Sequence, residues 1–275
     1  MKIIRIFPSR TKATPDDPDV RVGQVSPGLF DVADEVHISV AFTWHLEWAE
    51  LAAQNWRHVA PVRIGGPATG ERSGDFVPGF YMKRGYVITS RGCPNNCWFC
   101  SVPHREGRLR ELPVTDGWIV TDDNLLACSH EHLDRVFTML AKQSHRAQFV
   151  GGLEARLMTP ELARRFADLR PKSMYFAYDE IDDLEPLVQA GKMLINAGFS
   201  KASHIMRCYV LVGYDGDTFT AAIKRLYETW RAGFFPMAML YRDEKPRNGE
   251  WIRFNRMWAR PHIVGAKLKG GVRIA

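Results

Sequence analysis

The sequence lacks several features that define whole classes of protein. It contains no run of about 18 apolar residues, the length that a membrane-spanning helix requires, so we expect no membrane partner. The apolar stretch within residues 1–8 is too short, and is followed too soon by polar residues, to be a secretory signal. There is no heptad repeat and no low-complexity tract, which argues against a coiled coil and a long disordered segment.

Cysteine is scarce as well: the chain has five, and three of them lie close together. A disulfide framework needs more cysteines, more evenly spread, so a reducing compartment fits better and we expect a cytoplasmic protein. The two scattered cysteines, Cys128 and Cys208, are expected to serve as small apolar side chains.

With 45% hydrophobic residues, the chain can bury a full core. Short β-like runs start about 30 residues apart, the length of one βα unit, and amphipathic stretches lie between several of them. This alternation predicts an α/β fold with a parallel sheet. The predicted strands are 87–90, 118–121, 147–151, 174–177, 207–212 and 236–241. The predicted helices are 130–143, 160–169, 184–197 and 218–232, with caps at Ser129, Thr159, Gly198 and Gly233.

The two ends of the chain differ from this repeating part. Residues 1–83 hold two predicted strands, 34–40 and 60–64, around a predicted helix at 45–56, which indicates a small N-terminal α/β appendage. Residues 242–275 hold nine Lys and Arg against three Asp and Glu, an excess equal to the net charge of +6 of the whole chain. We therefore divide the chain into 1–83, 84–241 and 242–275.

The basic tail also carries three large aromatic residues, Trp251, Phe254 and Trp258. Positive charges neutralise phosphates and aromatic rings stack on bases, so one interpretation is a surface for nucleic acid or a phosphate-rich substrate. The other interpretation is a terminal segment that the aromatic side chains pack onto the sheet domain.

The three clustered cysteines, Cys93, Cys97 and Cys100, have the spacing C-x3-C-x2-C directly after the first predicted strand. Iron–sulfur clusters held by protein alone usually take four cysteines. Three thiolates on one loop would hold a cubane cluster and leave one iron open to another ligand. The alternative is a structural zinc site of the Cys3His type, with His104 as the fourth ligand.

Residues 89–100, with Phe99 just before the last cysteine, resemble the cluster loop of the radical SAM superfamily. The resemblance implies a (βα)6 partial TIM barrel, a [4Fe–4S] cluster on the three cysteines and S-adenosylmethionine (SAM) on the open iron. It also implies an external electron donor, such as flavodoxin or ferredoxin. In that family, SAM is cleaved reductively, and the resulting 5′-deoxyadenosyl radical takes a hydrogen atom from the substrate.

Polar side chains follow successive predicted strands, and the carboxyl ends of parallel strands meet at one edge of a sheet. The resemblance, which extends over about 62–240 and is strongest to the cobalamin-associated and methylthiotransferase-like branch, assigns these side chains to SAM. Arg156 has the forked guanidinium that binds a carboxylate. For single residues the alternatives are a helix cap, a loop ion pair or core packing. The predicted SAM contacts are Phe99, Asp122, Asp123, Glu154, Arg156, Glu180, Val212 and Met239.

The chain departs in three ways from the patterns of the wider superfamily, to which the Gly-Gly-Glu motif belongs, and of that branch. The Gly-Gly-Glu motif is missing after the second strand, and the D-x-H-x-x-G motif that supplies a cobalt ligand is missing from residues 1–83, so cobalamin is not expected. A second three-cysteine cluster is missing too, which argues against a methylthiotransferase. The predicted substrate is a nucleotide or nucleic-acid base, with a peptide or small metabolite as the alternative. A non-catalytic zinc module is the alternative from another class.

Overall fold

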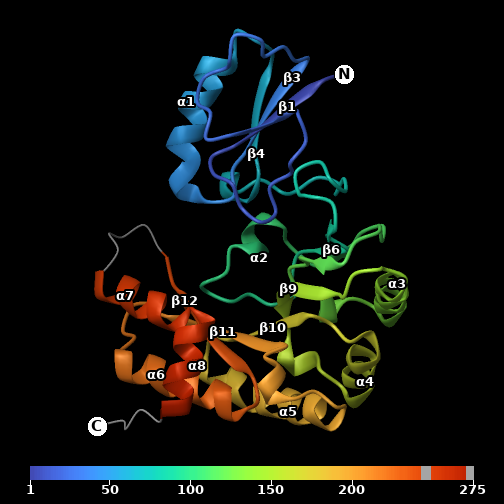
Figure 1. The fold of residues 1–275 in the computed structure, drawn as a ribbon, viewed down its shortest axis with the longest axis vertical. Helices are drawn as coiled ribbons and strands as arrows, with labels where there is room; N and C mark the ends of the chain where they lie inside the picture. Colours follow the sequence, from blue (N-terminus) through green and yellow to red (C-terminus); the bar gives the residue numbers. More distant parts are fainter. Residues whose placement is uncertain (243–248, 271–275) are drawn as a thin grey trace. The chain divides into compact units, whose positions relative to one another are not determined.

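The computed structural model describes residues 1–242 and 249–270, and the chain divides into two compact units, residues 1–117 and the residues from 118 onward (Figure 1). The parts of the predicted tail at 243–248 and 271–275 lie outside the described residues. In the described ranges, every helix is too short or too polar to cross a membrane. Both units are of the α/β type with a parallel sheet.

The first unit contains a four-stranded parallel sheet in the order β2-β1-β3-β4. Its strands are β1 (Ile3–Phe7), β2 (Val20–Val22), β3 (Glu35–Ser39) and β4 (Val62–Gly65). A 3-10 turn, η1 (Thr43–His45), leads into α1 (Leu46–Trp56), which packs against the sheet (Figure 1). Three alanines and Trp56 on the buried face of α1 meet Ile4, Ile6, Val36 and Ile38, so this unit has an apolar core of its own.

The strands β3 and β4 and the helix α1 confirm the elements predicted for residues 34–64. The strands β1 and β2 were not predicted. β1 carries the buried Ile4 and Ile6 in a run of five residues, and β2 has three residues that are all partly exposed. Neither strand is long enough to show a clear alternation of polar and apolar residues.

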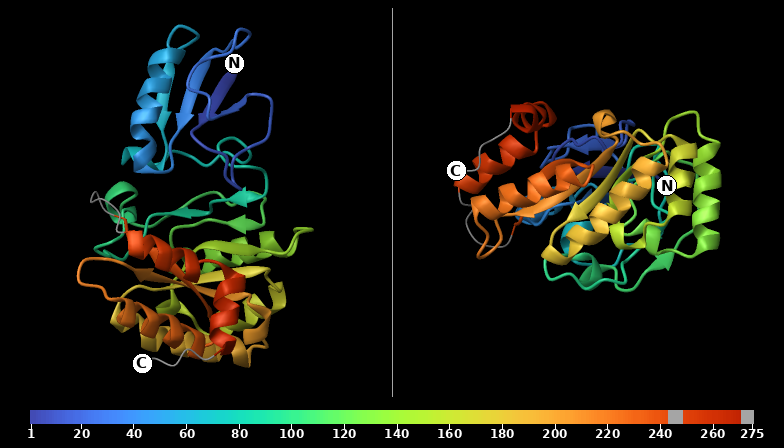
Figure 2. Two further views of the ribbon diagram at one scale, coloured as in Figure 1. Left: turned by 60° about the vertical axis from the view of Figure 1, so that its left-hand side comes forward. Right: turned by 90° about the horizontal axis from the view of Figure 1, so that it is seen from below.

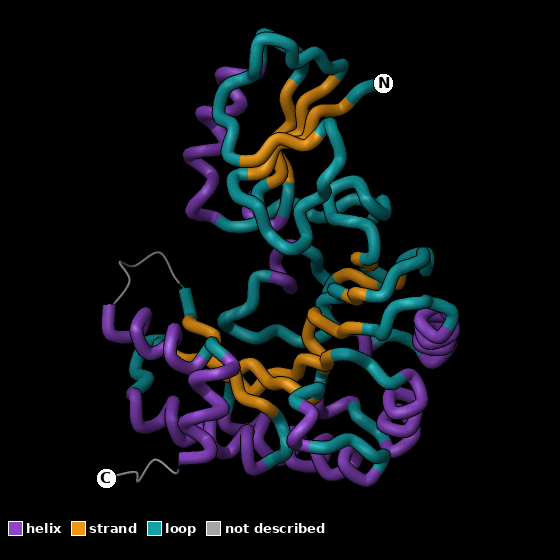
Figure 3. The backbone as a smooth tube through the Cα atoms, in the orientation of Figure 1, coloured by secondary structure: helices purple, strands orange, loops and turns teal. Residues whose placement is uncertain are grey.

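The rest of the first unit is mainly loop, with a few short elements (Figure 3). They are η2 (Pro67–Thr69), β5 (Tyr86–Val87), β6 (Ser90–Arg91), α2 (Val102–Arg105) and β7 (Arg110–Glu111). β6 and β7 form an antiparallel ribbon in which Ser90 lies opposite Glu111 and Arg91 lies opposite Arg110. The first predicted strand, 87–90, is therefore divided between two strands of two residues each.

In the second unit, five parallel strands follow the order β12-β11-β10-β9-β8. The helices that connect them lie beside one another, and Figures 1 and 2 show α4, α5 and α6 along the same face of the sheet. The strands are β8 (Ile119–Val120), β9 (Gln148–Leu153), β10 (Ser173–Tyr178), β11 (Met206–Val212) and β12 (Phe235–Leu240). The helices are α3 (His130–Ala141), α4 (Pro160–Leu169), α5 (Leu184–Asn196) and α6 (Phe219–Arg231). The 3-10 turns are η3 (Leu125–Ala127), η4 (Ala155–Leu157), η5 (Ile181–Asp183) and η6 (Lys201–Ser203).

These elements agree with the predicted ones to within a few residues, and the caps have the expected chemistry. The Ser129 hydroxyl accepts a hydrogen bond from the His132 amide, and Thr159 does the same for Leu162. In the middle of α5, Gly191 allows a close approach: a Cβ atom there would lie 2.0 Å from the Ala232 carbonyl oxygen, just after α6.

The described part of the tail forms two helices, α7 (Gly249–Trp258) and α8 (Pro261–Gly270). Phe254 and Trp258 are buried, and Trp251 lies 4.3 Å from the Phe219 ring at the start of α6, measured between ring centroids. This agrees with the interpretation in which the aromatic residues of the tail pack against the sheet domain.

Candidate functional site

The three cysteines lie on a long excursion, residues 92–109, between the two strands of the β6–β7 ribbon. The Cys93 amide donates a hydrogen bond to the Gly107 carbonyl (3.3 Å), so the outgoing and returning arms meet at the first cysteine. Gly92 has a φ of +82°, and a Cβ atom there would lie 2.4 Å from the Arg108 carbonyl oxygen. Glycine at position 92 is therefore required both by the backbone angle and by the close contact between the arms.

All three thiols are partly exposed, whereas Cys128 and Cys208 are buried. Burial raises the pKa of the Cys208 thiol well above its ordinary value, which agrees with the inert role predicted for it. In the part of the chain that the structure describes, no three His, Cys, Asp or Glu side chains are grouped so as to hold a metal ion. Three thiols are suitable ligands for an iron–sulfur cluster. In the described residues, however, the three side chains are not arranged as a preformed metal site.

The predicted fourth ligand of the zinc alternative, His104, lies on α2 within the same excursion and is exposed. Phe99 is partly buried and packs edge-on against Trp98, with 5.4 Å between ring centroids. Trp98 itself is 55% exposed. The excursion therefore presents an aromatic residue and a histidine beside its three thiols.

A buried carboxylate, Glu106, lies at the returning end of this excursion, and its side chain is 0% exposed. It accepts hydrogen bonds from the Ser73 hydroxyl, from Arg105 Nε (3.1 Å) and from Arg110 Nη2 (2.9 Å). Burial alone would raise its pKa. The hydrogen bonds from Ser73, Arg105 and Arg110, together with the charge of Arg91, outweigh that effect and lower the pKa of Glu106 to about 2. Glu106 is not among the site residues predicted from the sequence.

In the second unit, the ends of β8 and β9 come close together. A Cβ atom at Gly151 would lie 2.0 Å from the Asp122 carbonyl oxygen, so only glycine fits where the two backbones meet. Asn124 Nδ2 donates to Glu154 Oε2 (3.4 Å), which joins the polar groups that follow the two strands. Asp122 is 1% exposed, whereas Asp123 is partly exposed.

The ends of β9 and β10 are joined by Arg156. Its Nη2 lies 3.0 Å from Asp183 Oδ1, and its Nε lies 3.8 Å from Glu154 Oε1. The alternative of a loop ion pair is therefore present: Glu154 is one of the two partners expected for Arg156, the other being Glu161, and Asp183 is a partner that was not predicted. Glu180 forms a reciprocal capping box with Asp183 at η5, which is the helix-cap alternative for this residue.

Asp179, directly after β10, was passed over in favour of its neighbour Glu180. Its side chain is almost completely buried, and its Oδ1 atom has no hydrogen-bond partner. Burial raises the pKa of Asp179 to about 7; the negative charge of Asp183 adds to this, whereas a hydrogen bond from the Leu211 amide opposes it. The signal in the sequence was a carboxylate that closely follows a predicted strand and begins a run of acidic residues.

The two apolar residues predicted to contact SAM have different surroundings. Val212 is completely buried at the end of β11, which agrees with the alternative interpretation that it packs in the core. Met239 on β12 is 39% exposed and remains accessible. The Asp217 carboxylate accepts hydrogen bonds from the Gly213 amide (2.8 Å) and from Arg225 (2.8 Å), and so it fixes the turn after β11.

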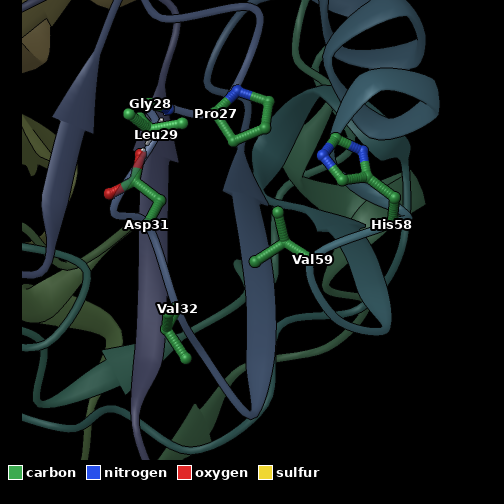
Figure 4. Close-up of a pocket in the computed structure, with 7 residues that line it drawn as sticks. All are labelled: Pro27, Gly28, Leu29, Asp31, Val32, His58 and Val59. Carbon is green, nitrogen blue, oxygen red and sulfur yellow. Dashed lines mark hydrogen bonds between the residues drawn. The ribbon is translucent and has the colours of Figure 1, made fainter.

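The first unit also has a surface pocket of about 550 Å³, and none of its lining residues is a predicted site residue (Figure 4). The Asp31 carboxylate at its edge is already bound by Arg21 and by the Gly28 amide. The remaining lining is mostly apolar, so this pocket offers little chemistry. It is lined by Pro27, Gly28, Leu29, Asp31, Val32, His58 and Val59.

Comparison of the chain with known proteins found no family model and no curated protein that match it.

Proposed function

We propose that this protein is a radical SAM enzyme that holds one [4Fe–4S] cluster on Cys93, Cys97 and Cys100. Three partly exposed thiols on one excursion support this function, because no fourth cysteine is near them in the sequence and the remaining two are buried in the second unit. A cluster with three protein ligands keeps one iron open. We further propose that the parallel sheet of the second unit belongs to a (βα)6 partial TIM barrel.

When bound, the cluster supplies the electron that cleaves SAM. The chain itself has to bind and orient the two ends of SAM. Asp123 is the more accessible of the two predicted acids after β8, and Glu154 is held beside Asn124 after β9. We assign the SAM ammonium group to these carboxylates, because a charge-assisted hydrogen bond is the strongest contact they can offer. Arg156 is already engaged with Asp183 and Glu154, so it positions those acids.

We propose a nucleotide or nucleic acid as the substrate, with a peptide or small metabolite as the alternative. The arginine face of α7 supports this choice. Arg253 and Arg256 are three residues apart on one side of α7, Arg260 follows the end of the helix, and all three are exposed. Phe254 and Trp258 lie in the core, and the partly buried Trp251 packs against Phe219, so the arginines would make the main contacts with the partner, through its phosphates.

The test is anaerobic reconstitution with iron and sulfide, followed by metal analysis and an assay for 5′-deoxyadenosine in the presence of SAM and reduced flavodoxin. Wild type should bind about four iron atoms per chain and produce 5′-deoxyadenosine, as expected for one cubane cluster. Replacing any one of Cys93, Cys97 and Cys100 by Ala should abolish both. Cys128→Ala is the control and should change neither.

His104→Ala separates the two metal hypotheses. Under the proposed function it keeps the iron and the activity. If the wild type instead binds one zinc ion, and His104→Ala loses it as completely as a cysteine variant does, the chain is a Cys3His zinc module and the proposed function is wrong.

A further inference from the structure

The ribbon that carries the cysteine excursion has two arginines directly opposite each other. Arg91 on β6 pairs with Arg110 on β7. Like charges at directly opposed positions of an antiparallel pair destabilise it. Arg105 adds a third positive charge, and its side chain is only 10% exposed. Glu106 is the carboxylate that these three arginines share.

Glu106 also joins three separate segments of the first unit. It binds Ser73 through both the hydroxyl and the amide of that residue, and it binds Arg110 on β7. Arg110 closes the network, because its guanidinium also donates to the Ser73 carbonyl (2.8 Å) and to the Glu106 carbonyl (3.2 Å). Both oxygen atoms of the Glu106 carboxylate therefore accept hydrogen bonds, as a buried charge requires.

This network lies next to the point where the two arms of the excursion meet. Glu106 precedes Gly107, whose carbonyl accepts the hydrogen bond from Cys93. Arg91 precedes Gly92, which is pressed against the Arg108 backbone. Loss of the Glu106 charge would remove the buried carboxylate that Arg105 and Arg110 both bind, and would separate the arms at the first cysteine.

We propose that Glu106 is a positioning residue for the three-cysteine excursion: it neutralises Arg91, Arg105 and Arg110 and so holds the arms in the register that cluster assembly needs. The statement that the excursion binds a cluster rests on the proposed function. The statement that Glu106 orders the backbone of the excursion does not depend on it. The two parts are therefore measured separately.

The first measurement uses the metal-free full chain and follows amide hydrogen exchange. In Glu106→Gln, which keeps the size of the side chain and removes its charge, the Cys93 and Leu112 amides should exchange at least about tenfold faster, because both bridge the two arms. Amides within β3 and β11 should be unchanged. Glu71→Gln is the matched control: it removes an exposed charge two residues from Ser73 and should have no effect.

The second measurement is the iron and sulfide content after anaerobic reconstitution, which should fall below about half of the wild-type content in Glu106→Gln and stay unchanged in Glu71→Gln. Addition of Arg91→Gln to Glu106→Gln removes one of the repelling charges, so it should bring exchange and cluster content partly back. A purely structural role would predict further loss from this second substitution.

Unchanged exchange at Cys93 together with unchanged cluster content overturns the inference. Faster exchange in Glu106→Gln, combined with a wild type that takes up no cluster, overturns the proposed function and leaves the positioning role in place. If Glu106→Gln does not fold, Ser73→Ala is measured in its place. It removes one hydrogen bond and keeps the charge, and the inference then requires faster exchange at Cys93 within an otherwise unchanged first unit.

Discussion

Two aspartates of the second unit lie just after neighbouring strands, and their surroundings give them opposite properties. Asp217, after β11, receives hydrogen bonds from Arg225 and from the Gly213 amide. Asp179, after β10, is similarly buried, but its Oδ1 atom has no partner, and Asp183 and Glu180 add negative charge around it. The same side chain is therefore a satisfied anion at one strand end and a strained one at the next.

The pKa of about 7 for Asp179 predicts a dependence of stability on pH. The folded state holds the proton more tightly than the unfolded chain, whose carboxyl has an ordinary pKa near 3.8. The contribution of Asp179 to stability is thus fully present below a pH of about 4 and is lost as the pH rises to about 7. Its upper limit is about 4 kcal/mol.

Asp179→Asn removes this titration and keeps the shape of the side chain. We expect the variant to be more stable than wild type at pH 8, by about 1 to 4 kcal/mol, and to lose most of that advantage at pH 4.5. Urea unfolding at the two pH values measures the difference. Asp182→Asn, an exposed neighbour on η5, is the control. An equal effect of Asp179→Asn at both pH values would contradict the prediction.

The limits of prediction also appear at the level of single residues. The cysteines, Asp122, Asp123 and Glu154 could be selected from the sequence, because each follows a strand or belongs to a tight motif. The partners of Arg156 and the network of Glu106 could not, because Ser73 lies 33 residues before Glu106 and Asp183 lies 27 residues after Arg156. Contacts of this kind depend on how the loops fold and leave no periodic pattern in the sequence.

Among the elements, the helices and strands of the second unit were predictable because each has a clear period and a clear boundary. α4 begins after Thr159 with a proline in its first turn, and its apolar residues Leu162, Ala163 and Phe166 share one face. β8 has two residues, and its end is defined by the contact between Gly151 and Asp122 rather than by propensity. Short strands in parallel sheets depend on their neighbours, so β8 is shorter than the strand predicted at 118–121.

The aromatic residues and the positive charges of the tail, which are interspersed in the sequence, lie on different sides of the helix α7. Its aromatic side faces the core, where Trp258 is 2% exposed and lies 6.0 Å from the Tyr227 ring of α6, between centroids. Its arginine side is exposed. The tail is thus part of the second unit, and only its positive charges remain to meet a partner.

If the partner is a nucleic acid, binding of a labelled single-stranded oligonucleotide should weaken steeply with salt. Changing Arg253, Arg256 and Arg260 together to Ala should reduce the slope of log K against log salt by roughly two, because each phosphate contact on a single strand contributes about 0.7. Fluorescence anisotropy measures the slope.

The control for this prediction removes the same charge elsewhere on the second unit. Arg164, Arg170 and Lys192 are exposed on or beside α4 and α5, and changing all three to Ala should leave the slope nearly as it is in wild type. Equal effects of the two triple variants would indicate non-specific attraction. A wild type without salt-dependent binding would favour a peptide or small metabolite as the substrate.

For the molecule as a whole, the proposed function divides its tasks between the two units. The cysteines belong to the first unit, which has its own apolar core, and the predicted strand-end acids belong to the second. Damage to one task should therefore leave the other measurable. The division itself, with its boundary at residues 117 and 118, was not visible in the sequence.

Asp123→Asn tests this division. We expect wild-type iron content and a SAM affinity weaker by roughly tenfold or more, because a charge-assisted hydrogen bond contributes about 1.5 to 3 kcal/mol. Isothermal titration of the reconstituted protein with SAM gives the affinity, and metal analysis gives the iron. Asp168→Asn, an exposed acid on α4, is the control. Unchanged SAM affinity in Asp123→Asn would move the ammonium contact to Glu154.

The close backbone approaches at Gly92, Gly151 and Gly191 have a consequence for ancestry. At each of them a Cβ atom would lie within 2.4 Å of a carbonyl oxygen from another part of the chain, so no other amino acid can occupy the position while the backbone keeps its path. Surface residues and many core residues can drift, whereas these three cannot. Together with the C-x3-C-x2-C spacing that begins one residue after Gly92, they form a fingerprint by which distantly diverged descendants of the same ancestor should be recognisable.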